Sequence, residues 1–172
     1  EIQGTVFTQP DNSEVWKPVT DDTSIEEGDL VRTGDDSSVV LTYPDDSHTA
    51  VAPNSVLTIL LMSSAEDGSR QEIVLRQEIG STLNVVQSLP SADSRFEIQT
   101  PSAIVTVRGT EFMVDVDAIG ATKVAVVEGI VEVSAQGITI ALSAGETTTV
   151  SMGSPPATAV PIPTVTKPPN KA

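Results

Sequence analysis

Short apolar or alternating runs separated by turn residues constrain this chain more than any other feature. Residues 38–43 (SVVLTY), 55–61 (SVLTILL) and 104–107 (IVTV) are typical of these runs, and Gly, Pro, Asn and Asp recur between them. Short strands with such frequent turn signals indicate an all-β sandwich, barrel or solenoid. No stretch has sustained helical periodicity bounded by caps, so little helix is expected. The sequence therefore predicts an all-β fold.

The predicted core is unusual in composition. Hydrophobic residues make up 38% of the chain, but only three Phe, one Trp and one Tyr are present. Aliphatic residues must therefore fill the core, and β-branched ones suit pleated, half-buried surfaces. Similar phrases recur without a fixed period, and small aliphatic residues suit stacked coils. We expect an irregular, twisted β-solenoid or roll of many short strands, with a two-sheet β-sandwich as the alternative.

The composition changes sharply after Val150. Residues 151–172 contain six of the twelve prolines, with Ser, Thr, Ala and Val between them. Proline lacks an amide donor and has a fixed φ, so a segment of this kind is expected to stay extended and flexible. The sequence predicts one all-β domain at residues 1–150 and a disordered Pro/Thr-rich linker or tail at residues 151–172.

The charge of the chain excludes several classes of partner. The formal net charge is −15, from 24 acidic and nine basic residues. Nucleic-acid binding needs clustered Lys and Arg, and anionic membrane surfaces attract basic proteins. Neither nucleic acid nor an anionic membrane is expected as a partner. A protein, a component of the cell envelope or a cation is compatible with the charge.

Acidic turns are concentrated in residues 1–46, which contain half of the acids against only Lys17 and Arg32 of opposite sign. Acidic residues are mostly exposed, so solvated loops are the simpler interpretation. Calcium is the alternative, because it binds roughly six to eight oxygen atoms and these turns could converge between stacked strands. No calcium-loop motif is present, and no other cofactor is expected. The candidate ligands are Asp21, Asp22, Asp35, Asp36, Asp45 and Asp46.

Catalytic groups are scarce. His48 is the only histidine and cysteine is absent, so thiol chemistry and ordinary zinc sites are excluded. His48 lies in a turn before a strand, without the Gly-x-Ser-x-Gly motif, and is expected at the surface. A hydrolase that uses two carboxylates stays an alternative on composition. Trp16 is expected to cap the N-terminal edge of the core rather than to stack on a sugar. We expect no enzymatic activity.

Residues 100–112 (TPSAIVTVRGTEF) predict two strands joined at a tight corner. Pro101 suits the start of a strand, where a missing amide does least harm. Gly109 can adopt a positive φ at the corner. Arg108 could reach a neighbouring carboxylate or carbonyl, and Thr110 could bind backbone groups. The residues expected to be structural rather than catalytic are Thr100, Pro101, Val107, Arg108, Gly109, Thr110 and Phe112.

The same segment resembles the signature of the FecR domain, the exported part of iron-dicitrate-type sigma-factor regulators. The resemblance extends over most of residues 28–150. Gly129 and Gly145 lie in two of the similar phrases and are expected at corners. Asp46 stands where the family usually has glycine, which leaves the type of that turn open. The similar phrases are residues 41–51 (LTYPDDSHTAV), 96–101 (FEIQTP), 124–133 (VAVVEGIVEV) and 142–150 (LSAGETTTV).

The resemblance implies a non-catalytic binding, scaffold or signalling module of the bacterial cell envelope, outside the cytoplasm, with a protein or envelope component as partner. It covers the domain alone, because the anti-sigma and transporter-signalling regions of those regulators have no counterpart in the 172 residues. No run approaches about 18 apolar residues, so no membrane insertion is expected of this segment, whereas an anchor or leader is expected beyond it. The alternatives are a calcium-stabilised structural or adhesive module and, less favoured, a carboxylate-based hydrolase.

Overall fold

The computed structural model describes residues 1–163, which form strands and no helix. Within this range there is accordingly no helical segment able to cross a membrane. The strands are β1 Ile2–Gln3, β2 Val6–Gln9, β3 Lys17–Pro18, β4 Leu30–Thr33, β5 Ser38–Thr42, β6 His48–Val51, β7 Val56–Ser64, β8 Gln71–Val86, β9 Arg95–Gln99, β10 Ile104–Val107, β11 Thr110–Val116, β12 Thr122–Glu128, β13 Ile130–Ala135, β14 Ile138–Ser143, β15 Glu146–Val150 and β16 Val160–Pro161.

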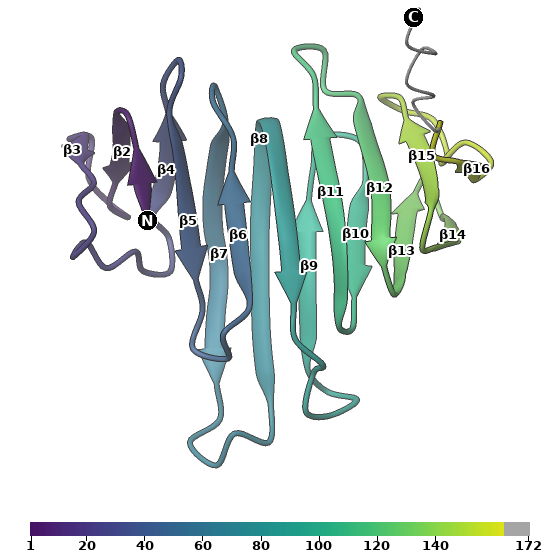
Figure 1. Ribbon diagram of the computed structural model, residues 1–172, viewed down its shortest axis with the longest axis horizontal. Helices are drawn as coiled ribbons and strands as arrows, with labels where there is room; N and C mark the ends of the chain where they lie inside the picture. Colours follow the sequence, from purple (N-terminus) through teal and green to yellow (C-terminus); the bar gives the residue numbers. More distant parts are fainter. Residues whose placement is uncertain (164–172) are drawn as a thin grey trace, which may run out of the picture.

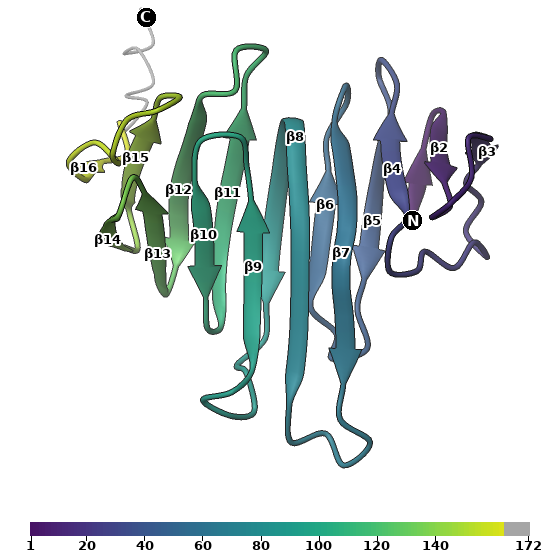
Figure 2. The same cartoon turned by 180° about the vertical axis from the view of Figure 1, so that it is seen from behind.

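All of these strands belong to one large, open sheet. The sheet folds over at β8 into two facing layers, which Figures 1 and 2 show from opposite sides. The front layer, which faces the viewer in Figure 1, contains β1, β5, β6, the second half of β8, β11, β12, β15 and β16. The back layer contains β2, β3, β4, β7, the first half of β8, β9, β10, β13 and β14. The sheet is mixed, because β8 and β9 run parallel while the other described pairs are antiparallel.

β8 joins the two layers because its two halves pair with different strands. Up to Ile79 it pairs with β7 and β9, and from Gly80 onward it pairs with β11 and β6. Gly80 has a φ of +96°, and a Cβ at this position would lie only 2.6 Å from the Cα of Ser55. Glycine alone combines this backbone conformation with so close an approach. The bend in β8 therefore depends on Gly80.

Elsewhere the chain changes layer at short corners between hairpins. β10 in the back layer leads to β11 in the front layer across Arg108 and Gly109, and β12 leads back to β13 at Gly129. Gly4 and Gly34 lie at two further crossings. Gly4 and Gly129 both precede a strand of the back layer, which explains why similar phrases recur in the sequence without a fixed period.

The core lies between the layers and is almost entirely aliphatic. Its rings form one contiguous group, in which Phe96 of the back layer contacts Tyr43 and Phe112 from the front. The ring centroid of Phe96 lies 5.9 Å from that of Tyr43 and 6.4 Å from that of Phe112, and both contacts are edge to face. Such pairs contribute about 0.5–1.5 kcal/mol beyond the area that they bury. Trp16 lies outside this core, half-buried, with the guanidinium of Arg32 4.4 Å from its ring.

A chain of buried polar side chains also lies between the layers. The Tyr43 hydroxyl donates to Thr49 Oγ1 at 3.0 Å, and Thr49 Oγ1 donates to Asn84 Oδ1 at 2.9 Å. Asn84 Nδ2 donates to Thr82 Oγ1, which donates in turn to Gln77 Oε1. Gln77 ends the chain by donating to two main-chain carbonyls. Since buried polar groups are costly without partners, this chain holds β6 and β8 in a single register.

The all-β prediction is confirmed. Neither of the finer expectations, a solenoid or roll and a two-sheet sandwich, is confirmed. The strands are not separate stacked coils, and the two layers are not separate sheets, because both share β8.

Residues 151–172 are predicted to be a disordered linker, and the structure differs from this prediction over residues 151–163. Pro156 is buried, and the carbonyl of Ala157 accepts a hydrogen bond from Thr148 Oγ1. β16 pairs with β15 at the edge of the front layer. Residues 151–163 thus continue the packed structure along β15, and the rest of the expected linker, residues 164–172, lies outside the described residues.

Candidate functional site

The 100–112 motif forms a crossing between the layers. β10 and β11 are separated only by Arg108 and Gly109, and Gly109 has a φ of +84°. The Arg108 side chain is exposed, and its Nη2 donates to the carbonyl of Ala92 at 2.7 Å. This bond ties the corner to the loop between β8 and β9. Arg108 thus holds the corner in place through a hydrogen bond to the main chain.

A second corner packs against the first. Gly129 has a φ of +88°, and a Cβ there would lie 2.6 Å from Cγ2 of Thr110 and 2.9 Å from the carbonyl oxygen of Gly109. Thr110 is buried, and its Oγ1 has no hydrogen-bond partner within residues 1–163, so the expected bond to backbone groups is not formed there. Val107 and Phe112 enter the core on either side of the corner. The sequence signature therefore marks two layer crossings that fit against each other.

Three other motif residues lie in turns. The Thr100 amide donates to the carbonyl of Ala103, and Thr100 Oγ1 accepts from the Ala103 amide, both at 2.9 Å. Pro101 lies inside this turn between β9 and β10 rather than at the start of a strand. Gly145 has a φ of +84° in the crossing from β14 to β15.

The six calcium candidates lie in three separate turns, two in each. Within residues 1–163, no three carboxylate or histidine side chains gather where they could hold a metal ion. The carboxylate of Asp45 instead accepts hydrogen bonds from the amide and hydroxyl of Ser47, at 3.0 and 2.7 Å. Asp36 and Asp46 adopt left-handed φ values of 52° and 65°. These residues support the turns themselves, and calcium binding stays a prediction.

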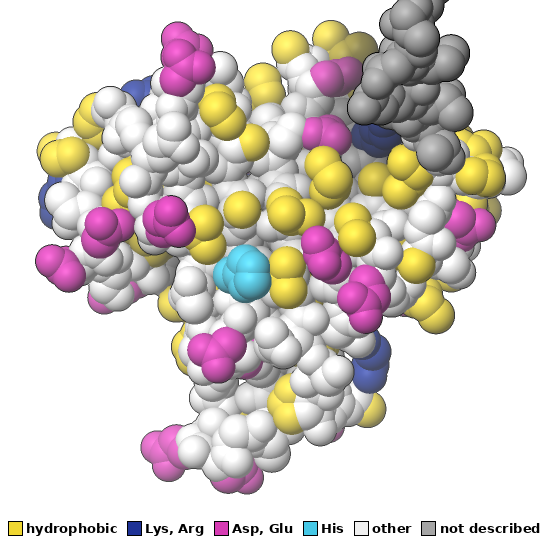
Figure 3. All heavy atoms as spheres, viewed as in Figure 1, with side chains coloured by type: hydrophobic (Ala, Val, Ile, Leu, Met, Phe, Trp, Pro, Cys, Tyr) yellow, Lys and Arg dark blue, Asp and Glu magenta, His cyan; other side chains and the backbone are white. Residues whose placement is uncertain are grey.

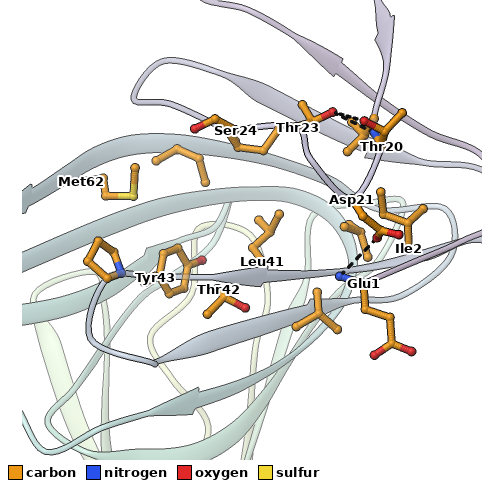
Figure 4. Close-up of a pocket in the computed structure, with 16 residues that line it drawn as sticks. Glu1, Ile2, Thr20, Asp21, Thr23, Ser24, Leu41, Thr42, Tyr43 and Met62 are labelled. Atoms are coloured by element: carbon orange, nitrogen blue, oxygen red, sulfur yellow. Dashed lines mark hydrogen bonds and ion pairs between the residues drawn. The ribbon is translucent and has the colours of Figure 1, made fainter.

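A cavity of about 500 Å³ opens at the N-terminal end of the molecule, as Figure 4 shows. Leu41, Tyr43 and Met62 line it, together with Thr20 and Thr23 from the loop before β4. The two threonine side chains hydrogen-bond to each other. Burial raises the pKa of the Tyr43 hydroxyl far above its usual range, so the phenol stays neutral in the folded protein even at alkaline pH.

Five apolar side chains form a row across the outer face of the front layer. Cross-strand pairing aligns them on β5, β6, β8, β11 and β12. Figure 3 shows a band of hydrophobic side chains, in yellow, across the middle of this face. Leu83 and Met113 are 36% and 41% exposed. Directly opposed side chains on one face of a sheet lie about 4.5–5.5 Å apart, so the row is continuous. The apolar row consists of Val40, Ala50, Leu83, Met113 and Ala125.

An acidic edge borders the apolar row on one side. A bulge in β12 places both Val127 and Glu128 opposite Glu111 of β11, and Val127 is 50% exposed. Glu111 and Glu128, which we call the acidic edge, therefore face each other across the strand pair. Like charges in this position are destabilising. Neither carboxylate has an ion-pair partner among residues 1–163.

The outer face of the back layer has a different charge arrangement. Glu72 contacts Arg70 at 2.7 Å and Arg95 at 3.3 Å, and Arg95 also contacts Glu97 at 3.6 Å. These acidic and basic side chains neutralise one another at β8 and β9. Exposed apolar area and uncompensated negative charge meet on the front face, which is therefore the candidate functional site.

Comparison with protein families identifies the family of this domain. Residues 29–132 match the family described as FecR protein. The chain belongs to this family. The matched region of the FecR domain contains the corner motif, the apolar row and the acidic edge. Comparison with curated proteins gave no match.

Two solved structures share the fold of this FecR domain. Both are crystal structures of a candidate anti-sigma factor from Parabacteroides distasonis ATCC 8503, at 2.50 and 1.65 Å resolution. Their TM-scores are 0.61 and 0.62, with 17% and 18% sequence identity over 77% of the FecR chain. The chain spans 59% of the length of that protein. At this identity the similarity establishes the fold.

The FecR signature was recognised from the sequence, but the apolar row was missed. Residues 112–114 (FMV) and 124–127 (VAVV) are apolar on both faces of a strand, although one face is turned outward. On β8 the pattern is reversed, since Thr82 and Asn84 point inward and Leu83 points outward. Continuous apolar runs in strands of an otherwise antiparallel sheet are the signal that could have revealed a covered outer face.

Proposed function

We propose that this FecR domain is a non-catalytic regulatory module that works outside the cytoplasm and binds a protein through the outer face of its front layer. The observation that carries the proposal is the apolar row beside the acidic edge. Contiguous exposed apolar patches on folded domains mark interaction sites. The fold shared with a candidate anti-sigma factor supports a role in signalling, and the family resemblance supports the location.

The contacts of Arg108 and His48 support the non-catalytic part of the proposal. Arg108, the only basic residue of the corner motif, donates to a main-chain carbonyl. His48 lies half-buried on β6, with Val85 of β8 as its neighbour across the strand pair. Neither side chain takes part in the acid, base and nucleophile arrangement of a histidine-dependent hydrolase.

The location is tested with a fusion of alkaline phosphatase after Ala172 of the intact gene in its native host. This enzyme needs disulfides, which form outside the cytoplasm. We expect an active phosphatase, with a cytoplasmic reporter at the same position inactive. The reverse result would contradict the proposed location.

The regulatory role is tested by deleting residues 1–163 from the intact gene and comparing transcripts with those of the parent strain. A regulatory module predicts a change confined to a small set of genes. As a control, Arg76→Gln alters the outer face of the back layer and should leave these transcripts unchanged. Identical transcripts in the deletion and parent strains would reject a regulatory role.

A further inference from the structure

We infer that the front face binds a basic amphipathic helix of the partner protein, with its apolar side chains on the apolar row and its Lys or Arg side chains against the acidic edge. This inference rests on the proposed function and specifies the chemistry of the partner.

The position of the apolar row determines the form of the bound segment. β6, β8, β11 and β12 each have neighbours on both sides, so their backbone groups are already paired. A segment that lies on this face must satisfy its own backbone hydrogen bonds, which favours a helix over an added strand. The row crosses five strands, a span of about 19 Å at about 4.8 Å per interval. A helix of about 13 residues has this length.

The apolar contact is centred on β8, β11 and β12. Leu83, Met113 and Val127 are the most exposed apolar residues in and beside the row. Leu83 and Met113 lie on regular strands and Val127 lies at the bulge of β12, and each follows a buried residue, so the surface is preformed. A helix with apolar residues at positions i, i+3, i+4 and i+7 could cover them with one face.

The charges determine the orientation and sign of the partner. On the far side of the row, Asp115 pairs across the strands with Lys123, so that border is balanced. Among residues 1–163 the acidic edge has no such counter-charge, and Glu111 and Glu128 repel each other. A Lys or Arg beside them would relieve this repulsion. The basic side of the bound helix is therefore expected to lie over β11 and β12 at the acidic edge.

Other occupants fit this surface less well. A second copy of the chain would bring a second acidic edge and a net charge of −15 toward the first. An anionic membrane would be repelled by the same carboxylates. A basic protein segment is attracted by them, and electrostatic complementarity of this kind also guides association.

The probe is a fluorescent 14-residue peptide with leucine on one helical face and lysine on the other. Two matched peptides replace every lysine with glutamate or every leucine with serine. Fluorescence anisotropy with the full chain should detect binding of the Leu/Lys peptide only. Hydrogen exchange should show protection on β8, β11 and β12.

Paired variants locate the contact. Glu111→Gln with Glu128→Gln should weaken binding about tenfold, since both carboxylates contact the peptide. Leu83→Ser with Met113→Ser should weaken it to a similar extent. The control, Glu66→Gln with Asp67→Asn, removes the same charge from the turn between β7 and β8 and should change affinity less than about twofold. Urea unfolding shows whether each variant is folded, and the Glu111/Glu128 variant should be at least as stable as the parent chain.

Several results would overturn the inference. These are equal weakening by the control variant, equal binding of the glutamate peptide, or no binding of the Leu/Lys peptide. A dimer in sedimentation velocity that is lost in Met113→Ser would assign the face to a second copy. Protection on another face would reject this surface as the binding site, whereas the regulatory role is tested separately by the transcript comparison.

Discussion

At Asp46 an aspartate adopts the left-handed backbone conformation in the turn between β5 and β6. The Asp46 amide donates to the carbonyl of Tyr43 at 3.1 Å, and the Tyr43 amide donates to the carbonyl of Ser47 at 2.9 Å. These bonds define a three-residue hairpin loop with a bulge. Glycine was expected here from the family resemblance, and aspartate replaces it because its short side chain tolerates this conformation better than most.

We expect Asp46→Gly to raise the free energy of unfolding by a few tenths to about 1 kcal/mol. Removal of the left-handed strain exceeds the extra entropy that glycine gives the unfolded chain. Urea unfolding measures the difference. Asp45→Gly is the control and should destabilise, because Asp45 accepts two hydrogen bonds from Ser47. A loss of stability in Asp46→Gly would contradict this account of the turn.

Tyr43 predicts how stability depends on alkaline pH. Burial raises the pKa of its hydroxyl, so the native state keeps the proton where the unfolded chain loses it. The resulting stability is complete below about pH 10 and is lost as the pH rises above that value, at up to about 1.4 kcal/mol per pH unit. Tyr43→Phe should flatten this decline in urea unfolding between pH 9 and about pH 11. An unchanged slope in the variant would rule out Tyr43 as the cause.

At the scale of elements, the bend in β8 decides the architecture. Both halves of β8 are required, because each one joins a different layer at the middle of the sheet. Residues 71–86 contain two apolar runs separated by Gly80, a pattern that predicts two strands. The structure has one strand, since Gly80 continues the ladder while it redirects the chain.

Gly80→Ala should therefore destabilise the fold by several kcal/mol, on the order of 3 kcal/mol or more, because the new methyl group meets the backbone of Ser55. Gly68→Ala is a matched control, since Gly68 also has a positive φ but no atom within 4 Å of the added Cβ. It should cost about 1 kcal/mol. Thermal and urea unfolding measure both variants. Equal effects would mean that the close contact with Ser55 is unimportant.

Strand content, the aliphatic core and the corner glycines were predictable from local patterns. Gly109 and Gly129 stand between apolar runs, and a turn at each follows from steric rules. The folding of one sheet into two layers was not predictable, because it depends on which distant strands pair with each half of β8. The buried bonds of Asn84 and Gln77 depend on the same pairing, and polar residues in an alternating run normally indicate the solvent face.

The candidate site was partly hidden for the same reason. Leu83 and Met113 are 30 residues apart in the sequence and become neighbours only when β8 pairs with β11. The repulsion between Glu111 and Glu128 depends on the bulge that places Val127 beside them. The acidic turns could be recognised in the sequence. The two acidic residues on this face could not, because only the strand register places Glu111 opposite Glu128.

At the scale of the whole molecule, the two outer faces differ in how their charges are arranged. On the back face, Glu72, Arg95 and Glu97 of β8 and β9 form ion pairs. The front face combines the apolar row with the acidic edge. Most of the acids elsewhere lie in turns and contribute net negative charge that keeps the chain soluble.

Site-specific photo-crosslinking in the native host tests the central claim most directly. A benzophenone amino acid is introduced at Leu83 on the front face and, as the control, at Arg76, an exposed residue on the outer face of the back layer. The account predicts that the Leu83 position crosslinks to one protein and that the Arg76 position does not. Crosslinks to the same protein from both positions, or from Arg76 alone, would contradict the assignment of function to the front face.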